Sequence, residues 1–351
     1  MSKLILDCDL MKTPNSGLYH YCLSLGQHVN QVLEERGEEH MKFYVPTAEA
    51  QTFSKRDTIV EQPNHKFLKP FLWDCKVWHA PFQAGRIIPK SKRIKIVLTI
   101  HDLNILHQNL PIEEQAKGIK HLQELINRAD AIICISEFCK NDVLKNCDTK
   151  GKVLYVIYNG VNDLKHPALL STSYQPKFPF LFAIGFINQK KNLHVLLPLL
   201  IQNKDMELLI AGRLDEPAYI SDMQRQAEEM GIKDRFHILG PVSEEEKAWY
   251  LKHCTAYVHP SLAEGFGLPV VEAMSLGKPL FLSNLTSLPE IGGEAAFYFQ
   301  NFEPEHMQQV YVNGMRKYGE NGLVEKIIER STYFNWQQNA AKYVEVYYSL
   351  L

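Results

Sequence analysis

The chain has 351 residues, of which 45% are hydrophobic and 22% are charged, and its formal net charge at pH 7 is -2. This length suggests two domains, and the composition is typical of a folded globular protein. A charge so close to zero excludes recruitment of nucleic acid by a global basic field, so we expect no nucleic-acid partner.

The cysteine content and the apolar runs indicate where the protein works. Seven cysteines without a C-x-x-C pair indicate unpaired thiols in a reducing compartment. Strand-like sequence begins at Leu4, which leaves no room for a signal peptide, and the longest apolar runs are too short to span a bilayer. We therefore expect a cytoplasmic protein, with contact at the inner face of the membrane left open.

Short apolar segments alternate with helical patterns along the first half of the chain. We expect strands at residues 4–8, 41–45, 77–80, 94–100, 131–135 and 153–157, and helices at residues 18–36, 112–129 and from residue 137 onward. Ser136 stands where it can cap the third helix. Residues 46–75 have no regular pattern. The alternation predicts a parallel sheet with helices on both faces.

A polar stretch with three prolines, residues 163–179, interrupts this alternation and is expected to link two domains. The alternation then resumes. We expect strands at residues 180–184, 207–211, 236–239, 256–259 and 279–282, and helices at residues 192–201, 218–230, 243–253 and 336–351. Ser243 and Glu246 have the spacing of a capping box. Two doubly wound halves predict a cleft in which ligands lie beyond the carboxyl ends of the strands.

One stretch of the second half combines carboxylates, glycines and a helix start. Glu264 and Glu272 lie eight positions apart, after the strand-like segment at residues 256–259. Pro269 suits the first turn of a helix, because its missing N–H would have no partner there. The loop at residues 264–268 therefore leads into a helix N-terminus, where amides and the helix dipole favour an anion. Amides for a phosphate beside carboxylates for hydroxyls suit a sugar nucleotide.

The ordered set of loops resembles the retaining GT-B glycosyltransferases of family 4 over nearly the whole chain. The most specific part is Pro-Ser-Leu-Ala-Glu-Gly-Phe-Gly-Leu-Pro-Val-Val-Glu-Ala at residues 260–273; residues 283–292 and Asn159-Gly-Val161 also look like that family. The resemblance implies an α/β GT-B fold with two Rossmann-like domains facing a central cleft. It implies an acceptor domain at residues 1–165, a donor domain at residues 166–335, and a last helix at residues 336–351 that packs on the first domain.

The resemblance also implies roles for the central stretch. Glu272 would bind the ribose hydroxyls of the donor nucleotide, and Glu264 would contact the transferred sugar near its anomeric carbon and stabilise oxocarbenium-like charge. The amides of Phe266, Gly267 and Leu268 would bind the sugar and the diphosphate. Taken alone, Glu264 is better interpreted as a solvated loop residue and Glu272 as a helix N-terminal residue stabilised by the helix dipole.

A lysine in the motif at residues 185–192 fits the family's cation for the leaving group. Lys191 would neutralise the nucleoside diphosphate as the glycosidic bond breaks, so that no metal is needed. The family usually carries arginine directly after the glycine, and this chain has Phe186 instead. Lys190 and Arg213 are candidate substitutes, with Lys190 equally well interpreted as a solvated surface lysine.

Four further residues follow expected strand ends or open expected helices. His101 ends a buried strand; it is either a core histidine or, as the resemblance implies, a ligand of the donor sugar, with Asp102 orienting its ring or capping the next helix. Gly17 opens a helix and is either a turn glycine or part of a loop over the diphosphate. Val242 and Glu244 lie where the family binds the base, although surface roles fit Glu244 equally well.

Basic and aromatic residues gather between residues 65 and 95. They are Lys66, Phe67, Lys69, Phe71, Leu72, Trp73, Lys76, Trp78, Arg86, Lys90, Lys92, Arg93 and Lys95. Such a patch suits contact with an anionic membrane, and solvated loops beside a core strand explain it equally well.

The resemblance to family 4 implies a retaining, metal-independent hexosyltransferase without a cofactor. Its partners would be a nucleotide-sugar donor and a glycan or lipid-linked acceptor in polysaccharide biosynthesis. The His101-Asp-Leu-Asn104 sequence looks most like mannosyltransferases that use GDP-mannose. The alternatives are a non-catalytic nucleotide-sugar-binding protein and a sugar-nucleotide epimerase of the same fold. A dinucleotide oxidoreductase is disfavoured, because no G-x-G-x-x-G follows the strands at residues 4–8 or 180–184.

Overall fold

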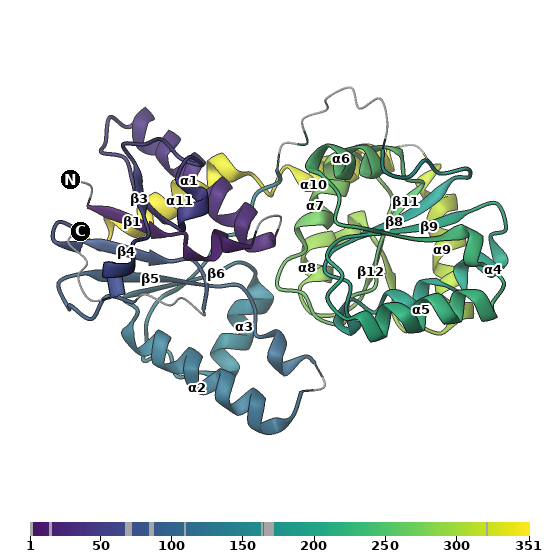
Figure 1. The fold of residues 1–351 in the computed structure, drawn as a ribbon, viewed down its shortest axis with the longest axis horizontal. Helices are drawn as coiled ribbons and strands as arrows, with labels where there is room; N and C mark the ends of the chain where they lie inside the picture. The colour runs from purple at the N-terminus through teal and green to yellow at the C-terminus, as the bar shows by residue number, and fades with distance from the viewer. Residues whose placement is uncertain are drawn as a thin grey trace. The chain divides into compact units, whose positions relative to one another are not determined.

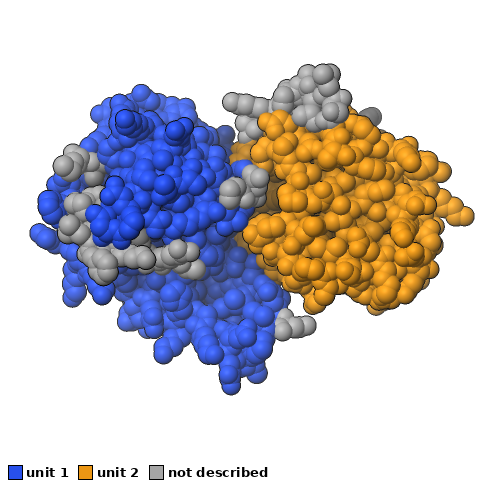
Figure 2. All heavy atoms as spheres, in the orientation of Figure 1, with its two compact units in different colours: residues 1–160, 335–351 blue, residues 161–334 orange. Residues whose placement is uncertain are grey.

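The computed structural model describes residues 3–13, 16–66, 72–83, 88–108, 110–162, 164, 172–320 and 322–351. The chain forms two compact units, coloured blue and orange in Figure 2. The first consists of Met1–Gly160 and Asn335–Leu351, and the second of Val161–Phe334. The boundary expected between residues 165 and 166 lies outside the described residues, as does most of residues 163–171.

The first unit contains a parallel sheet of seven strands in the order β3-β2-β1-β4-β5-β6-β7. The strands are β1 (Leu4–Asp7), β2 (Lys42–Val45), β3 (Thr58–Val60), β4 (Val77–Ala80), β5 (Lys95–Ile100), β6 (Ala131–Cys134) and β7 (Leu154–Val156). The expectation of irregular structure throughout residues 46–75 was wrong at β3. This strand is three half-buried residues at the sheet edge, too short to show an alternating pattern.

The longer helices of the first unit are α1 (Gly17–Glu35), α2 (Ile112–Arg128), α3 (Glu137–Asn146) and α11 (Trp336–Tyr348), and short 3₁₀ turns span Asp9–Lys12, Thr47–Glu49, Pro63–Lys66 and Asn104–Leu106. Ser136 caps α3 as predicted, and its side chain accepts a hydrogen bond from the amide of Cys139. In Figure 1, the C-terminal helix α11 lies beside α1. The two helices share one hydrophobic core with β1 and β4.

Buried hydrogen bonds tie α11 to the sheet. His79 on β4 places Nδ1 2.8 Å from the hydroxyl of Tyr347 and Nε2 2.7 Å from Oγ1 of Thr99. The hydroxyl of Tyr21 on α1 lies 2.8 Å from that of Tyr343. Burial lowers the pKa of His79 to about 3, so its ring is neutral near pH 7 and can donate through one nitrogen and accept through the other.

The second unit contains a parallel sheet of six strands in the order β10-β9-β8-β11-β12-β13. The strands are β8 (Phe180–Ile184), β9 (Glu207–Ala211), β10 (Phe236–Gly240), β11 (Ala256–His259), β12 (Leu280–Ser283) and β13 (Phe297–Phe299). The helices are α4 (Leu199–Gln202), α5 (Pro217–Glu229), α6 (Glu244–His253), α7 (Leu268–Ser275), α8 (Leu288–Gly292), α9 (Pro304–Tyr318) and α10 (Leu323–Ser331), with 3₁₀ turns at Gln189–Lys191, Leu193–Leu196, Lys233–Arg235 and Gly293–Ala295.

In the second unit, the predicted start of α6 was confirmed, and the helix predicted after β8 was wrong. Ser243 and Glu246 form the predicted capping box. The continuous helix expected at residues 192–201 is instead a 3₁₀ turn followed by the single turn of α4. Asn192 adopts a left-handed conformation with φ 55°, and Pro198 supplies no N–H to continue a helical hydrogen-bond ladder.

Both sheets confirm the predicted pair of doubly wound Rossmann-like domains. In each, successive strands first extend toward one edge and the chain then returns to extend the sheet toward the other edge. The reversal occurs between β1 and β4 in the first unit and between β8 and β11 in the second. In such sheets, ligands bind beyond the carboxyl ends of the strands at this switch point. In the part of the chain that the structure describes, we find no helix with the length and hydropathy of a bilayer-spanning segment.

Candidate functional site

Lys191 and Glu264, predicted from two separate motifs, form an ion pair at the switch point of the second sheet. Lys191 lies in the loop after β8 and Glu264 in the loop after β11, and Nζ is 2.5 Å from Oε1. The side chains are 14% and 11% exposed. A Cβ atom at Gly185 would lie 3.0 Å from Cε of Lys191, so a glycine after β8 leaves room for the lysine.

Glu264 has a second partner that the sequence analysis missed. Nε2 of His259 lies 2.9 Å from Oε1 of Glu264, and the hydroxyl of Tyr257 lies 2.8 Å from Nδ1 of His259. Tyr257 and His259 are two positions apart on β11, so strand alternation places both on one face. This Tyr-x-His spacing directly before the glutamate motif is the sequence feature that could have revealed the second partner of Glu264.

The electrostatics of this group keep Glu264 ionised. Burial alone would raise the pKa of Glu264, but the charge of Lys191 and the hydrogen bond from His259 hold it well below its usual range. Burial lowers the pKa of His259, and Glu264 opposes this in part. A neutral His259 that donates to Glu264 through Nε2–H accepts from Tyr257 at Nδ1. Glu264 can therefore accept hydrogen bonds or stabilise positive charge, but it holds no proton to donate near pH 7.

The backbone of Glu264 is fixed by the loop after β12. Oγ1 of Thr286 accepts a hydrogen bond of 2.9 Å from the amide of Glu264, and the hydroxyl of Ser287 donates one of 2.9 Å to its carbonyl. Thr286 has φ 52°, which is unfavourable for a β-branched residue. Backbone strain of this kind persists where surrounding structure enforces it, often at functional sites. Neither Thr286 nor Ser287 was predicted to have a role at the site.

The amides predicted to bind the sugar and diphosphate lie at the start of α7. Gly267 precedes the helix with φ 94°, a conformation that glycine adopts readily. Leu268 begins the helix and Pro269 lies in its first turn, as predicted. Helix geometry supplies no acceptor to the amide of Leu268, whereas Pro269 has no N–H and the amide of Val270 donates to the carbonyl of Gly267 over 2.9 Å. The side chain of Phe266 is buried 5.4 Å from the ring of Phe334, so Phe266 could contribute to a ligand site only through its backbone.

Glu272 lies on α7 and is linked through Lys247 to Glu244, one of the residues expected near the nucleotide base. Its Oε1 is 3.0 Å from Nζ of Lys247 on α6, and Lys247 also pairs with Oε2 of Glu244 at 2.7 Å. Lys247 is buried, whereas the side chain of Glu244 is 46% exposed. Val242 is half-buried in the loop before α6. Glu244 thus contacts Glu272 through Lys247 rather than standing alone on the surface.

Phe186, which replaces the arginine usual after the glycine, has a cation beside it. The guanidinium carbon of Arg213 lies 4.0 Å from the ring centroid of Phe186, and Arg213 also pairs with Asp215 at 2.7 Å. The amide of Ile187 donates to the carbonyl of Arg213 over 2.8 Å, which joins the loops after β8 and β9. A positive charge is therefore present next to Phe186, carried by a different loop.

His101 and Gly17 lie in the first unit, at carboxyl ends of its strands and the start of α1. Nε2 of His101 is 2.8 Å from the carbonyl of Pro81, and Gln83 accepts a hydrogen bond from the His101 amide. Oδ1 of Asp102 accepts a hydrogen bond of 2.9 Å from the amide of Asn104, the first residue of the following 3₁₀ turn. Burial lowers the pKa of His101 to about 4. A Cβ atom at Gly17 would meet nothing within 4 Å, so its backbone is accessible.

Only part of the basic and aromatic patch expected at residues 65–95 is exposed at the surface. Trp78 does not belong to it, because it lies on the central strand β4 and is fully buried. Trp73 is 79% exposed, and Lys90, Lys92 and Arg93 are exposed. Phe67, Lys69, Phe71 and Arg86 lie outside the described residues.

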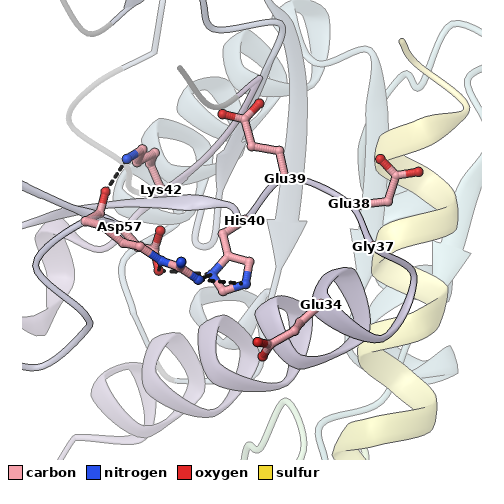
Figure 3. A pocket seen from close by; sticks show the side chains of 8 residues that line it. Glu34, Gly37, Glu38, Glu39, His40, Lys42 and Asp57 are labelled. Atoms are coloured by element: carbon pink, nitrogen blue, oxygen red, sulfur yellow. Dashed lines mark hydrogen bonds and ion pairs between the residues drawn. The ribbon is translucent and has the colours of Figure 1, made fainter.

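The first unit has a cavity of about 460 Å³, and Figure 3 shows its side chains around the loop that joins α1 to β2. The lining residues are Glu34, Gly37, Glu38, Glu39, His40, Lys42, Arg56 and Asp57. The cavity borders the amino end of β2. Ligands of this kind of sheet bind at the opposite, carboxyl edge, so we do not assign the donor to it.

Asp7-Cys8-Asp9 has the spacing of an Asp-x-Asp pair, which the sequence analysis overlooked. Burial raises the pKa of Asp7 to about 8, so it is largely protonated near pH 7, and Asp9 pairs with Lys12. Within the described ranges, no group of three or more His, Cys, Asp or Glu side chains is arranged to hold a metal ion. All seven cysteines are unpaired thiols, as predicted.

Comparisons with known families match both halves of the chain. The profile described as "Glycosyl transferases group 1" matches residues 172–331, and the profile "Glycosyltransferase Family 4" matches residues 66–163. O-antigen chain mannosyltransferase B of Escherichia coli is 25% identical, over 84% of this chain and 85% of that protein. O-antigen chain mannosyltransferase RfbU of Salmonella typhimurium is 24% identical, over 70% of this chain and 71% of that protein.

A solved structure shares the fold over the whole chain. The structure of Anabaena Alr3699/HepE in complex with UDP-glucose superposes with a TM-score of 0.76 and 17% identity, covering 99% of each chain. At this identity the similarity establishes the fold.

Proposed function

We propose that this chain, which belongs to the GT-B glycosyltransferases of family 4, transfers a hexose from a nucleotide-sugar to a hydroxyl of a glycan or lipid-linked acceptor with retention of configuration. The observation that carries the proposal is the buried Lys191–Glu264 pair beside the amides that start α7. This arrangement brings a cation, amides and an ionised carboxylate together at one switch point, as binding of an anionic sugar donor requires.

Mannose from GDP-mannose is the proposed donor substrate, since both relatives named above are mannosyltransferases. Those relatives act on O-antigen chains, which supports an acceptor that is a growing surface glycan and a role in polysaccharide biosynthesis. We propose a cytoplasmic location for the protein, because its seven unpaired thiols suit a reducing compartment.

In the proposed reaction, the bond between the anomeric carbon and the diphosphate oxygen breaks while the acceptor oxygen attacks from the same face. The proton of the acceptor hydroxyl passes to an oxygen of the departing phosphate. Lys191 and the amides of Gly267 and Leu268 at the start of α7 stabilise the negative charge that grows on the nucleoside diphosphate, so the reaction needs no metal ion. The ionised Glu264 stabilises positive charge near the anomeric carbon and accepts hydrogen bonds from sugar hydroxyls.

Residues of the first unit are proposed as further ligands. If Nε2–H of His101 donates to the carbonyl of Pro81, its Nδ1 remains an acceptor for a hydroxyl of the donor sugar. Gly17, where a side chain would meet nothing, offers backbone to the diphosphate or the acceptor. His101→Ala should lower turnover with the sugar nucleotide while the affinity for the nucleotide alone stays within about twofold, since the ring would contact only the sugar. An equal loss of affinity for both would contradict this role.

The donor can be identified by thermal unfolding. A ligand that binds only the folded protein raises its stability, so GDP and GDP-mannose should raise the melting temperature more than UDP, ADP and their sugars. Equal stabilisation by UDP or ADP would refute the choice of guanine. No stabilisation by any nucleotide would refute the proposed function.

Phe186 favours a second candidate, a protein that binds a nucleotide-sugar without transferring the sugar. Without an arginine after Gly185, the diphosphate loses a usual charge partner, and Arg213 would have to compensate from its stacked position. Nucleotide binding without release of GDP in the presence of any acceptor would support this candidate.

Contact with an anionic membrane is proposed for the exposed part of the patch, namely Trp73, Lys90, Lys92 and Arg93. The protein should sediment with vesicles that contain phosphatidylglycerol at low salt and be released by high salt. Failure to sediment at low salt would remove this part of the proposal.

A further inference from the structure

The carboxylate of Glu272 is held by two donors from distant parts of the second unit. Nζ of Lys247 on α6 lies 3.0 Å from Oε1, and Nδ2 of Asn162 lies 3.0 Å from the same oxygen. Asn162 is the second residue of this unit and precedes Glu272 by 110 positions. Hydrogen bonds from two different segments restrict the carboxylate more than one flexible partner would.

Both donors use one oxygen of the carboxylate. Among the described residues, none donates a hydrogen bond to Oε2 of Glu272. A carboxylate can accept through both oxygens, so Oε2 keeps its capacity for two hydrogen bonds. Neighbouring hydroxyls on one ligand, as on a ribose, match that capacity.

The environment of Lys247 indicates a fixed charge rather than a ligand-binding lysine. Its side chain is 8% exposed, and it pairs with both Glu272 and Glu244. Burial alone would lower the pKa of Lys247, but these two carboxylates hold it above its ordinary value. Two of its three N–H groups are therefore engaged by carboxylates, so Lys247 is poorly placed to bind a ligand directly.

We propose that Asn162 and Lys247 are positioning residues, which fix Oε1 of Glu272 so that Oε2 accepts hydrogen bonds from the ribose hydroxyls of the donor nucleotide. This inference rests on the proposed function, because it takes the ligand to be a ribonucleotide. It adds two residues, Lys247 on α6 and Asn162 near the start of the unit, that determine whether the site distinguishes ribose from a deoxygenated sugar.

The test compares ribonucleotides with their 2′,3′-dideoxy counterparts by calorimetric titration. The pair used is the diphosphate, among GDP, UDP and ADP, that binds the wild-type protein most tightly. Wild type should prefer the ribonucleotide by about tenfold or more, as expected for hydrogen bonds to a charged group. Asn162→Ala and Lys247→Met should each reduce this preference severalfold, with the affinity for the dideoxy nucleotide changed by less than about twofold.

The matched control for Lys247→Met is Lys252→Met, the same substitution at an exposed position of α6, which should keep the wild-type preference. If Lys247→Met fails to fold, Asn162→Ala decides the question alone. Equal loss of affinity for both nucleotides would show a merely structural role and overturn the inference, as would an unchanged preference in Asn162→Ala.

The failure of the proposed function gives a different result from the failure of this inference. If wild type binds none of the three nucleotides, the proposed function is wrong and the inference falls with it. If wild type binds a nucleotide but shows no preference for ribose, the inference alone is overturned.

Discussion

Replacing Lys191 by alanine removes the cation proposed to stabilise the leaving group. Nζ of Lys191 lies 2.5 Å from Oε1 of Glu264, and both side chains are largely buried. In Lys191→Ala, Glu264 keeps His259 as its partner but loses the opposite charge. The pKa of Glu264 should therefore rise, because burial would no longer be offset by the lysine.

Two effects of this substitution can be estimated separately. Loss of one charge-stabilising donor costs about 3–4 kcal/mol in the transition state, which lowers turnover by about a hundredfold or more. Breaking a fully buried ion pair destabilises a protein by about 3–5 kcal/mol, and the residual exposure and the remaining hydrogen bond from His259 place this pair below that range. We expect a folded protein with a lower melting temperature and a much larger loss in turnover than in donor affinity.

The assay measures the initial rate of GDP release at saturating GDP-mannose and acceptor, together with thermal unfolding. Lys204→Ala, at an exposed lysine of the same unit, is the control and should behave as wild type. Turnover within about threefold of wild type in folded Lys191→Ala, far above the hundredfold loss expected, would refute the assigned role.

Three further predictions concern charge, pH and metal. Arg213→Gln should weaken GDP binding about tenfold if its guanidinium, stacked on Phe186, contacts the diphosphate; unchanged binding would exclude it. The pKa of His79 is about 3 in the folded protein and near 6.5 in the unfolded protein, so the unfolded state binds more protons between these two pH values. The free energy of unfolding should therefore fall as the pH drops below 6.5, by up to about 1.4 kcal/mol per pH unit. His79→Gln should reduce this slope in acid titrations followed by denaturant unfolding, and an equal slope would contradict the assignment. Turnover should be the same with and without EDTA; its loss would contradict a metal-independent reaction.

The fold was predictable where buried strands are long enough to show a pattern. Apolar runs such as residues 94–100 and 207–211 marked central strands directly. The edge strands β3 and β13, of three residues each, were not predicted, because three residues are too few to show a periodic pattern; the equally short edge strand β7 was predicted because it lies within the apolar run at residues 153–157. The broken helix after Asn192 depends on a left-handed residue, which helical periodicity does not reveal.

The candidate site was predictable as separate motifs but not as a set of contacts. Lys191 and Glu264 are 73 positions apart, and only the order of parallel strands brings their loops together. Thr286 and Ser287 act on the backbone of Glu264, and such bonds leave no spacing signal in the sequence. Lys247 follows three glutamates and looks like part of a solvated helix face, yet packing of α6 against α7 buries it.

The most direct test of the central claim is the anomeric configuration of a product made by the purified protein. GDP-α-mannose is incubated with a panel of lipid-linked and free glycan acceptors, and the one-bond carbon–hydrogen coupling at the new anomeric centre is measured by NMR. We predict mannose transfer that yields an α-linkage, with Glu264→Gln lowering the rate by about a hundredfold. A β-linked product would contradict retention. Nucleotide binding without transfer from any GDP-, UDP- or ADP-sugar would contradict an enzyme altogether.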